Sequence, residues 1–360
     1  MYVVNVRRQR LAVAVMLAGC APAIGLAQQQ RPFVERVDVA QVLIDVRVVD
    51  NRSQPVTGLA PTDFEVRIDG KPARVETVEW AGTAERDASP LASTQAAGFL
   101  DAGPAGRLVV FLVQRNWQAD SVSVRTRDVG LMRILQLTEP LFALLKPDDQ
   151  VAVLSFDTHL KIWSDFTSDF DRVRQLLSQN VLLGKPGAIS ASPDRSLIEG
   201  LTLEQGRKTY TIEDALGVVG HALESLPGAK TIVLLGFGFD PTDRAQVAVH
   251  DRRTAGSKET HERILDALIR ARVAVFSIDF TDADFHTFEL GLQEVSEVTG
   301  GFYVRANLFA QRAIKQVADS LRGAYVLFVE KPESRPGRHE VAVKLVNRKG
   351  TVLARSAYVD

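Results

Sequence analysis

The chain has 360 residues, of which 46% are hydrophobic and 24% are charged, as in an ordinary folded globular protein. Its formal net charge of -1 at pH 7 excludes the strongly basic balance of proteins that attract nucleic acid through their overall field. Cys20 is the only cysteine, so no intramolecular disulfide can form and a hydrophobic core must stabilise the fold.

Residues 1–27 have the pattern of an export signal peptide. Three arginines in residues 7–10 precede an apolar run, residues 11–18, that is too short to span a bilayer as a stable anchor. The tripeptide Gly-Leu-Ala before Gln28 resembles an ordinary signal peptidase site, whereas Leu-Ala-Gly-Cys20 resembles a bacterial lipobox. Lipidation of Cys20, simple cleavage and an uncleaved anchor therefore remain open. All three predict an exported product, either periplasmic, anchored as a lipoprotein or secreted.

The next segment, residues 36–82, has the pattern of a small N-terminal β unit. Residues 37–50 alternate as a strand does, and residues 64–68 and 71–80 flank an Asp-Gly pair that favours a tight hairpin turn. Residues 83–106 are rich in Ala, Gly, Ser and Pro, which predicts a linker.

Residues 107–323 alternate between continuous apolar strands and helices. Strands are expected at 109–113, 150–156, 160–163, 230–236, 273–280 and 300–304, and helices at 122–145, 171–182, 211–226, 258–271, 288–299 and 308–321. Such a pattern predicts an α/β fold with a doubly wound, mostly parallel, Rossmann-like sheet covered on both faces. Pro140 predicts a kink in the first helix, and residues 183–208 an irregular loop.

Residues 324–360 return to a β pattern, with strands expected at 324–329, 338–346 and 351–359. Neither this segment nor residues 36–82 has enough strands for independent stability. We therefore expect one sheet, a small β domain built from both chain ends, with the α/β domain inserted between them.

Four segments in this order resemble one family. They are residues 39–70, ending in Thr-Asp-Phe-Glu-Val-Arg-Ile-Asp-Gly; residues 144–167; residues 298–301, Val-Thr-Gly-Gly; and the strands from residue 324. Together they resemble the von Willebrand factor A (VWA)-related proteins of acidobacterial type. The resemblance covers nearly all of the chain after the signal and implies a VWA fold, an exported product and no established activity.

The resemblance also implies a Mg²⁺ site, made of an Asp-x-Ser-x-Ser loop, a Thr from a second loop and an Asp after a later strand. In this chain the first loop falls on Gln114, Asn116 and Gln118, and the last position on Phe237. Mg²⁺ is usually held through one or two carboxylates. We therefore expect a degenerate metal site and no cofactor.

Other residues keep an alternative open. Shifting the first loop by one residue still supplies no Asp, but Thr209 and Thr211 can offer hydroxyls. Asp120 and Asp240 lie near enough in sequence to serve as displaced ligands. A metal-dependent adhesion domain with displaced ligands is thus one alternative function.

The binding face is expected at the carboxyl ends of the parallel strands, where such sheets bind ligands. Arg115 and Trp117 lie there, and Arg and Trp are common interface anchors, although Trp117 can equally pack on its own loop. The candidate partner-binding residues are Gln114, Arg115, Asn116, Trp117, Gln118, Thr209, Thr211, Phe237 and Asp240.

Signatures of catalysis are missing from the sequence, which has no nucleophile elbow, dinucleotide fingerprint or P-loop. The six histidines have no metal-ligand spacing and are expected at the surface or in caps; they are His159, His221, His250, His261, His286 and His339. Four carboxylates are expected to serve turns and helix caps, namely Asp157, Asp165, Asp169 and Asp171.

The sequence thus predicts a non-enzymatic, metal-independent protein-binding or scaffolding module of the cell envelope. Its partner would be a protein and not a nucleic acid, and it would touch the membrane only through an N-terminal lipid, where one is attached. An exported hydrolase of unrecognised type is the second alternative.

Overall fold

The computed structural model describes residues 41–82, 106–115, 131–133, 135–228, 230–239, 241, 258–281, 286, 288–306 and 309–360. The expected signal peptide with Cys20, the linker, most of the first loop and Asp240 lie outside the described residues. None of the described helices is long and apolar enough to cross a membrane.

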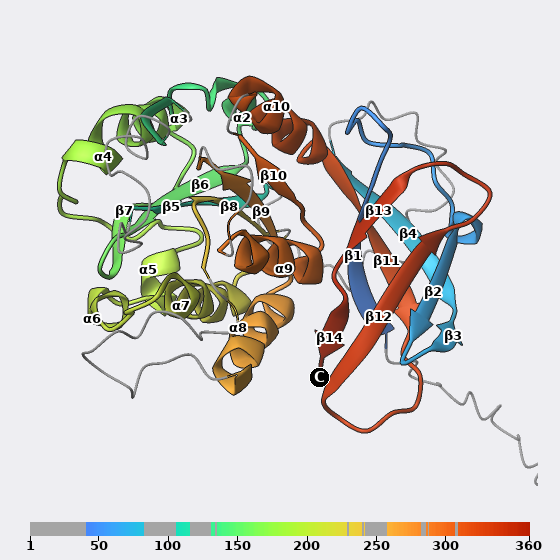
Figure 1. The fold of residues 1–360 in the computed structure, drawn as a ribbon. Helices are drawn as coiled ribbons and strands as arrows, with labels where there is room; N and C mark the ends of the chain where they lie inside the picture. Colours follow the sequence, from blue (N-terminus) through green and yellow to red (C-terminus); the bar gives the residue numbers. More distant parts are fainter. Residues whose placement is uncertain are drawn as a thin grey trace, which may run out of the picture. The chain divides into compact units, whose positions relative to one another are not determined.

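A six-stranded sheet forms the centre of the α/β part, in the order β10-β9-β8-β5-β6-β7 (Figure 1). The strands are β5 (Leu108–Gln114), β6 (Gln150–Phe156), β7 (Leu160–Thr167), β8 (Lys230–Gly236), β9 (Val273–Asp279) and β10 (Tyr303–Arg305). All neighbours pair in parallel except β7, which is antiparallel to β6. This is the 3-2-1-4-5-6 order of doubly wound folds, and the predicted fold class is confirmed.

Helices cover both faces of this sheet. Successive residues of β5 point to opposite faces, so Val110 and Leu112 belong to one hydrophobic cluster and Val109 and Phe111 to the other. The helices of the first face include α5 (Leu197–Gly200), α7 (Ile212–Glu224), α8 (Lys258–Arg270) and α9 (Glu289–Thr299). Those of the second include α2 (Glu139–Phe142), α3 (Phe170–Gln175), α4 (Val181–Leu183) and α10 (Ala310–Ser320).

Two expectations about local structure differ from what the fold contains. The kink expected at Pro140 is a break, because Pro140 lies in the first turn of α2, where its missing N–H costs no hydrogen bond. The loop expected over residues 183–208 contains α5 and the short helix α6 (Leu203–Arg207). A π-helical turn, Leu176–Asn180, joins α3 to α4.

The two ends of the chain pair with each other in two four-stranded sheets, ordered β13-β1-β11-β4 and β14-β12-β2-β3. The first end supplies β1 (Gln41–Val49), the 3₁₀ turn η1 (Pro61–Asp63), β2 (Phe64–Ile68), β3 (Lys71–Ala73) and β4 (Val75–Gly82). The second supplies β11 (Gly323–Glu330), β12 (Arg338–Leu345), β13 (Thr351–Ala354) and β14 (Ala357–Val359).

The single expected sheet is therefore two sheets that share a core. Ile44 and Leu327 from one sheet and Ile68 from the other are fully buried in that core. The segment expected as one strand, 351–359, is divided between the two sheets and changes from one to the other at Arg355 and Ser356. The Ser356 N–H donates to the carbonyl of Val298 on α9, which turns the chain away from β13.

Candidate functional site

The carboxyl ends of β5 and β8 lie side by side at the point where the strand order reverses, which is where doubly wound sheets bind ligands. Here the side chain of Gln114 crosses from β5 to the loop after β8. Its Nε2 donates to the carbonyl of Gly238 at 2.8 Å, and its Oε1 accepts from the N–H groups of Phe237 at 3.1 Å and Gly238 at 3.0 Å. Only 3% of Gln114 is exposed. The Gln114 side chain thus links the end of β5 to the loop after β8, and its amide is hydrogen-bonded to backbone groups.

Two glycines make this bridge sterically possible. A Cβ on Gly236 would lie 2.4 Å from the Oε1 of Gln114. Gly238 has a φ of +97°, in the left-handed region, and a Cβ there would lie 2.1 Å from the carbonyl oxygen of Phe288. The loop after β8 is therefore built to receive the Gln114 amide.

The ring of Phe237 points into the sheet's second hydrophobic cluster. It is 7% exposed and packs edge-on against Phe280, with ring centroids 6.3 Å apart. The Phe237 side chain therefore offers no oxygen atom to a metal ion, and apolar side chains surround it.

The two candidate threonines use their hydroxyls locally. Thr209 is 1% exposed; its Oγ1 donates to the carbonyl of Gly206 and accepts from the N–H of Leu160, both at 2.8 Å. Thr211 is the N-cap of α7 and accepts from the N–H of Asp214 at 3.0 Å. Thr211 thus fixes the start of α7, and Thr209 ties α6 to the start of β7.

Among the described candidates, Arg115 and Thr211 keep part of their side chains in solvent, whereas Gln114, Thr209 and Phe237 are buried. Arg115 donates from Nη2 to the carbonyl of Leu182 at 2.6 Å. The structure therefore brings Gln114 and Phe237 together at one point. Asn116, Trp117, Gln118 and Asp240 lie outside the described residues.

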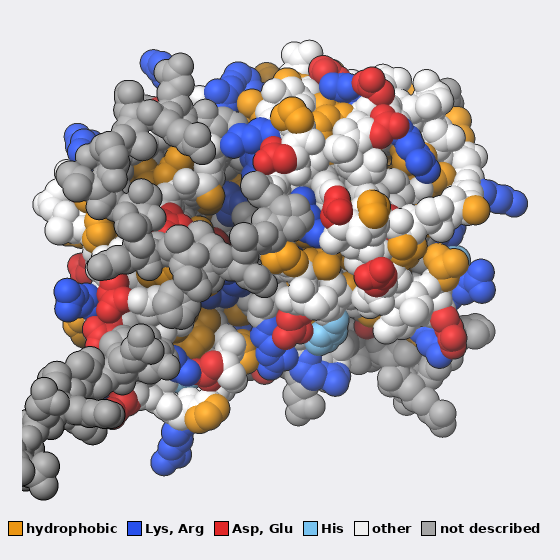
Figure 2. All heavy atoms as spheres, turned by 180° about the vertical axis from the view of Figure 1, so that it is seen from behind, with side chains coloured by type: hydrophobic (Ala, Val, Ile, Leu, Met, Phe, Trp, Pro, Cys, Tyr) orange, Lys and Arg blue, Asp and Glu red, His pale blue; other side chains and the backbone are white. Residues whose placement is uncertain are grey.

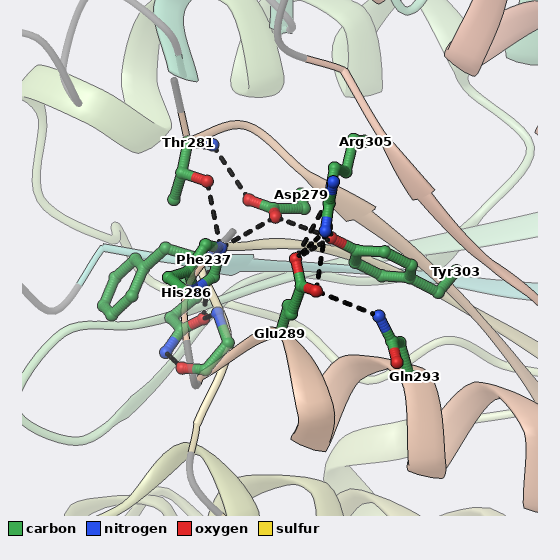
Figure 3. A network of polar contacts seen from close by, with 10 residues as sticks. Phe237, Asp279, Thr281, His286, Glu289, Gln293, Tyr303 and Arg305 are labelled. Atoms are coloured by element: carbon green, nitrogen blue, oxygen red, sulfur yellow. Dashed lines mark hydrogen bonds and ion pairs between the residues drawn. The ribbon is translucent and has the colours of Figure 1, made fainter. Parts of the chain in front are cut away.

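A polar network that sequence reasoning missed lies at the carboxyl ends of the neighbouring strands β9 and β10 (Figure 3). Asp279, the last residue of β9, is fully buried. Its Oδ2 lies 2.9 Å from Nε2 of His286 and accepts from the Tyr303 hydroxyl at 2.8 Å, while its Oδ1 accepts from the N–H of Thr281 at 2.9 Å. Burial first, and then the charge of Asp279, raise the pKa of the Tyr303 hydroxyl, which therefore keeps its proton.

The second half of the network is held by Glu289, at the start of α9. Its carboxylate accepts from Nε of Arg305 at 3.0 Å and from Nη2 at 2.6 Å, and from the Tyr303 hydroxyl at 3.1 Å. These hydrogen bonds also raise the pKa of Arg305, Glu289 contributing most. Asp279, His286 and Glu289 offer ligand atoms within 4.8 Å of one another, but both carboxylates are already bonded to protein donors.

This network could not be predicted from sequence spacing, because its members come from four separate segments of the chain. The available signal was an acidic residue, Asp279, ending an otherwise apolar strand, followed by His286 and Glu289 three residues apart at a helix start. Two other histidines also differ from the expectation of a surface position: His261 is 8% exposed and His339 is 5% exposed. Each has carboxylate partners, Glu213 for His261 and Asp69 for His339.

Of the four carboxylates expected in turns and caps, Asp165 differs, because it lies within β7 and accepts from the N–H groups of Ser192 and Leu197. Asp171 lies in the first turn of α3. Asp169 caps α3 by accepting from the N–H of Arg172 at 3.0 Å. Asp157 accepts from the N–H of Thr158 at 2.6 Å in the turn between β6 and β7.

The sequence matches no family model, and no curated protein is significantly similar to it. Comparison with solved structures does find similar folds. A von Willebrand factor type A structure from Catenulispora acidiphila has 12% identity and a TM-score of 0.41, over 87% of this chain and 75% of that one. An aerotolerance-related membrane protein from Bacteroides fragilis has 14% identity and a TM-score of 0.36, over 60% and 98%. The vWF domain of the type V pili tip protein Mfa5 from Porphyromonas gingivalis has 11% identity and a TM-score of 0.36, over 60% and 95%.

The Mg²⁺ positions implied by the VWA resemblance fall, among described residues, on Gln114 and Phe237. A cation there would meet an uncharged amide oxygen that already accepts two N–H groups, and an apolar ring in place of a carboxylate. These two residues do not fit a Mg²⁺ site.

Proposed function

We propose that this chain is an exported, non-enzymatic protein-binding or scaffolding module of the cell envelope, with a VWA-like domain that binds its partner without a metal. The observation that carries the proposal is the Gln114 bridge at the strand ends. The amide of Gln114 cannot coordinate a cation or bind a ligand carboxylate while it makes three hydrogen bonds to the backbone.

Exposed apolar side chains flank the same edge of the sheet and suit a protein partner. Tyr210, between the two candidate threonines, is 61% exposed, and Leu183, next to the carbonyl that Arg115 binds, is 85% exposed. Tyrosine and arginine are frequent anchors of protein interfaces. On the face drawn in Figure 2, acidic and basic side chains are interspersed among hydrophobic ones. Such a mixture favours a specific contact over binding through a field of one sign.

The network around Asp279 is the feature that would favour the enzyme alternative, since perturbed groups gather at catalytic sites. The directions of its pKa shifts argue otherwise. A raised pKa keeps Tyr303 neutral and Arg305 charged, and neither change produces a nucleophile or a base. The network is better explained as the support that fixes the start of α9 against β9 and β10.

Metal independence is tested by thermal unfolding of the purified chain. We expect no change in melting temperature on adding saturating Mg²⁺ or Mn²⁺, and none with a chelator, because a ligand stabilises a fold only when it binds the native state. The positive control is the quadruple variant Gln114→Asp, Asn116→Ser, Gln118→Ser and Phe237→Asp, which restores the metal pattern. Calorimetry that finds one stoichiometric cation site in the unaltered chain would refute metal independence. It would favour the alternative of a metal-dependent domain with displaced ligands.

Partner binding is tested by affinity capture from envelope extracts, repeated with chelator. We expect the same partner to be retained with and without chelator and to be lost with Tyr210→Ala. Val346→Ala, an exposed apolar residue that follows the end of β12, is the matched control and should retain it. Loss of the partner with chelator alone, or equal loss with both variants, would contradict the proposed mode of binding.

A further inference from the structure

A buried group of positive charges lies at the opposite, amino-terminal edge of the α/β sheet. We call it the cationic cluster; its members are Arg47, Lys230, Arg272 and Arg355. They come from β1, the start of β8, the turn after α8 and the link between β13 and β14. Together with Asp45 they line a cavity of about 20 Å³ between the chain-end sheets and the α/β part.

The charges in the cationic cluster do not balance. Its one carboxylate, Asp45, is committed to Arg272, which binds it with two hydrogen bonds of 2.9 and 2.7 Å. Arg47, Lys230 and Arg355 form no ion pair with a described residue at the salt-bridge distance of 4.0 Å or less. The four cations that line the cavity therefore face a single carboxylate, Asp45, among its described lining residues.

These cations are deeply buried and only partly satisfied. Arg47 is 7% exposed and Arg355 is 8% exposed, and the Nε–H group of each has no hydrogen-bond partner among the described residues. Their other contacts are neutral: Arg47 reaches the Thr231 hydroxyl at 3.5 Å, and Arg355 donates to the carbonyl of Ile269 at 3.1 Å. Lys230 is 6% exposed and donates only to backbone carbonyls.

Burying unpaired charge is costly, and burial shifts the pKa of these groups toward the neutral form. Burial lowers the pKa of Lys230 to about 8 and that of Arg355 to about 10. Both values remain above neutral pH, so each group still carries its charge there. An unpaired buried donor and an uncompensated buried cation are each strongly destabilising, and an anion among them would relieve both.

The size of the cavity selects the anion. A space of about 20 Å³ holds one water-sized species and not a polyatomic oxyanion or the carboxylate of a larger ligand. We propose that the cationic cluster binds one small monatomic anion, chloride, which the N–H groups of Arg47 and Arg355 and the ammonium of Lys230 hold in the cavity. The ion joins the strands contributed by the chain ends to the amino edge of the α/β sheet.

The test is urea unfolding of the full chain at neutral pH and constant ionic strength, with chloride replaced stepwise by gluconate. Above the dissociation constant, each tenfold rise in chloride should lower the unfolding equilibrium constant by about tenfold, as expected for one site. Lys230→Met and Arg355→Met should abolish this dependence. Lys349→Met, at an exposed turn, is the matched control and should keep it.

Three results would overturn the proposal. The first is equal stability in chloride and gluconate. The second is a chloride dependence that is the same in all three variants. The third is an anomalous difference map from bromide-soaked crystals with no peak in the cavity. Should Arg355→Met fail to fold, Lys230→Met still decides the matter, because it removes an ammonium group that donates to two backbone carbonyls in the described part of the chain.

Discussion

Replacing the Gln114 amide by an apolar side chain of similar length should destabilise the fold substantially. In Gln114→Met the three hydrogen bonds of 2.8, 3.0 and 3.1 Å are lost, and the buried N–H groups of Phe237 and Gly238 and the Gly238 carbonyl lose this partner. A net hydrogen bond contributes about 1 kcal/mol, and each buried group left unsatisfied costs about 1–3 kcal/mol. Since the loop can relax to expose some of these groups, we expect the free energy of unfolding to fall by about 3 kcal/mol.

Urea unfolding followed by circular dichroism measures this change as a lower midpoint with an unchanged slope. The matched control is Gln311→Met, on the exposed side of α10, which should stay within about 0.5 kcal/mol of the unaltered chain. If Gln114→Met is no less stable than this control, the amide is not a structural bridge. Gln114 would then be free to bind a metal or ligand, and the reasoning for metal independence would be refuted.

Three further predictions concern the rest of the chain. Metabolic labelling with a clickable fatty acid should mark the unaltered protein and not Cys20→Ala; a mature protein beginning at Gln28 would instead establish simple cleavage. A chain ending at Gly323 lacks β11 to β14, so it should expose the apolar face of β1 and aggregate, and a monomer that melts like the full chain would contradict this. The hydrogen bond that His261 donates to Glu213, the largest effect, raises the pKa of His261. The stabilisation is therefore complete below the ordinary value of 6.5 and is lost as pH rises through the raised value. His261→Gln should therefore destabilise the fold at about pH 5.5 and much less at about pH 9, whereas an equal loss at both would show that the charge is irrelevant.

The apolar strands could be found from the sequence because their signal is local. The run from Lys230 to Gly236 was expected with the bounds that the structure gives it, since burial on both faces demands continuous apolar residues. By contrast, β7 was expected to stop at Trp163 and extends to Thr167. The polar Asp165 ended the pattern, yet it is buried and accepts from the N–H groups of Ser192 and Leu197, which are remote in sequence.

Only part of the candidate site could be predicted from the sequence, because some of its contacts are local and others join residues far apart in the chain. The sequence places Gln114 at a strand end and Phe237 at the expected metal position, because both follow apolar runs. It cannot show that the Gln114 amide is saturated, since its partners are more than a hundred residues away and depend on the left-handed φ of Gly238. The network of Asp279, Tyr303 and Arg305 is likewise assembled by the sheet and not by any motif.

The pairing of β1 with β11 has a consequence for the order in which the chain can fold. Gln41 pairs with Glu330, so β1, the first of the described strands to be synthesised, cannot pair until β11 has been made. The α/β sheet can close in the meantime, because all of its strands lie between these two. Until synthesis is nearly finished, the apolar residues Ile44, Val46 and Val48 have no partner strand, and such a segment invites wrong association. The pairing that completes this sheet is thus a long-range one, which slows folding in general, and a chaperone that delays misassembly would be most useful on β1.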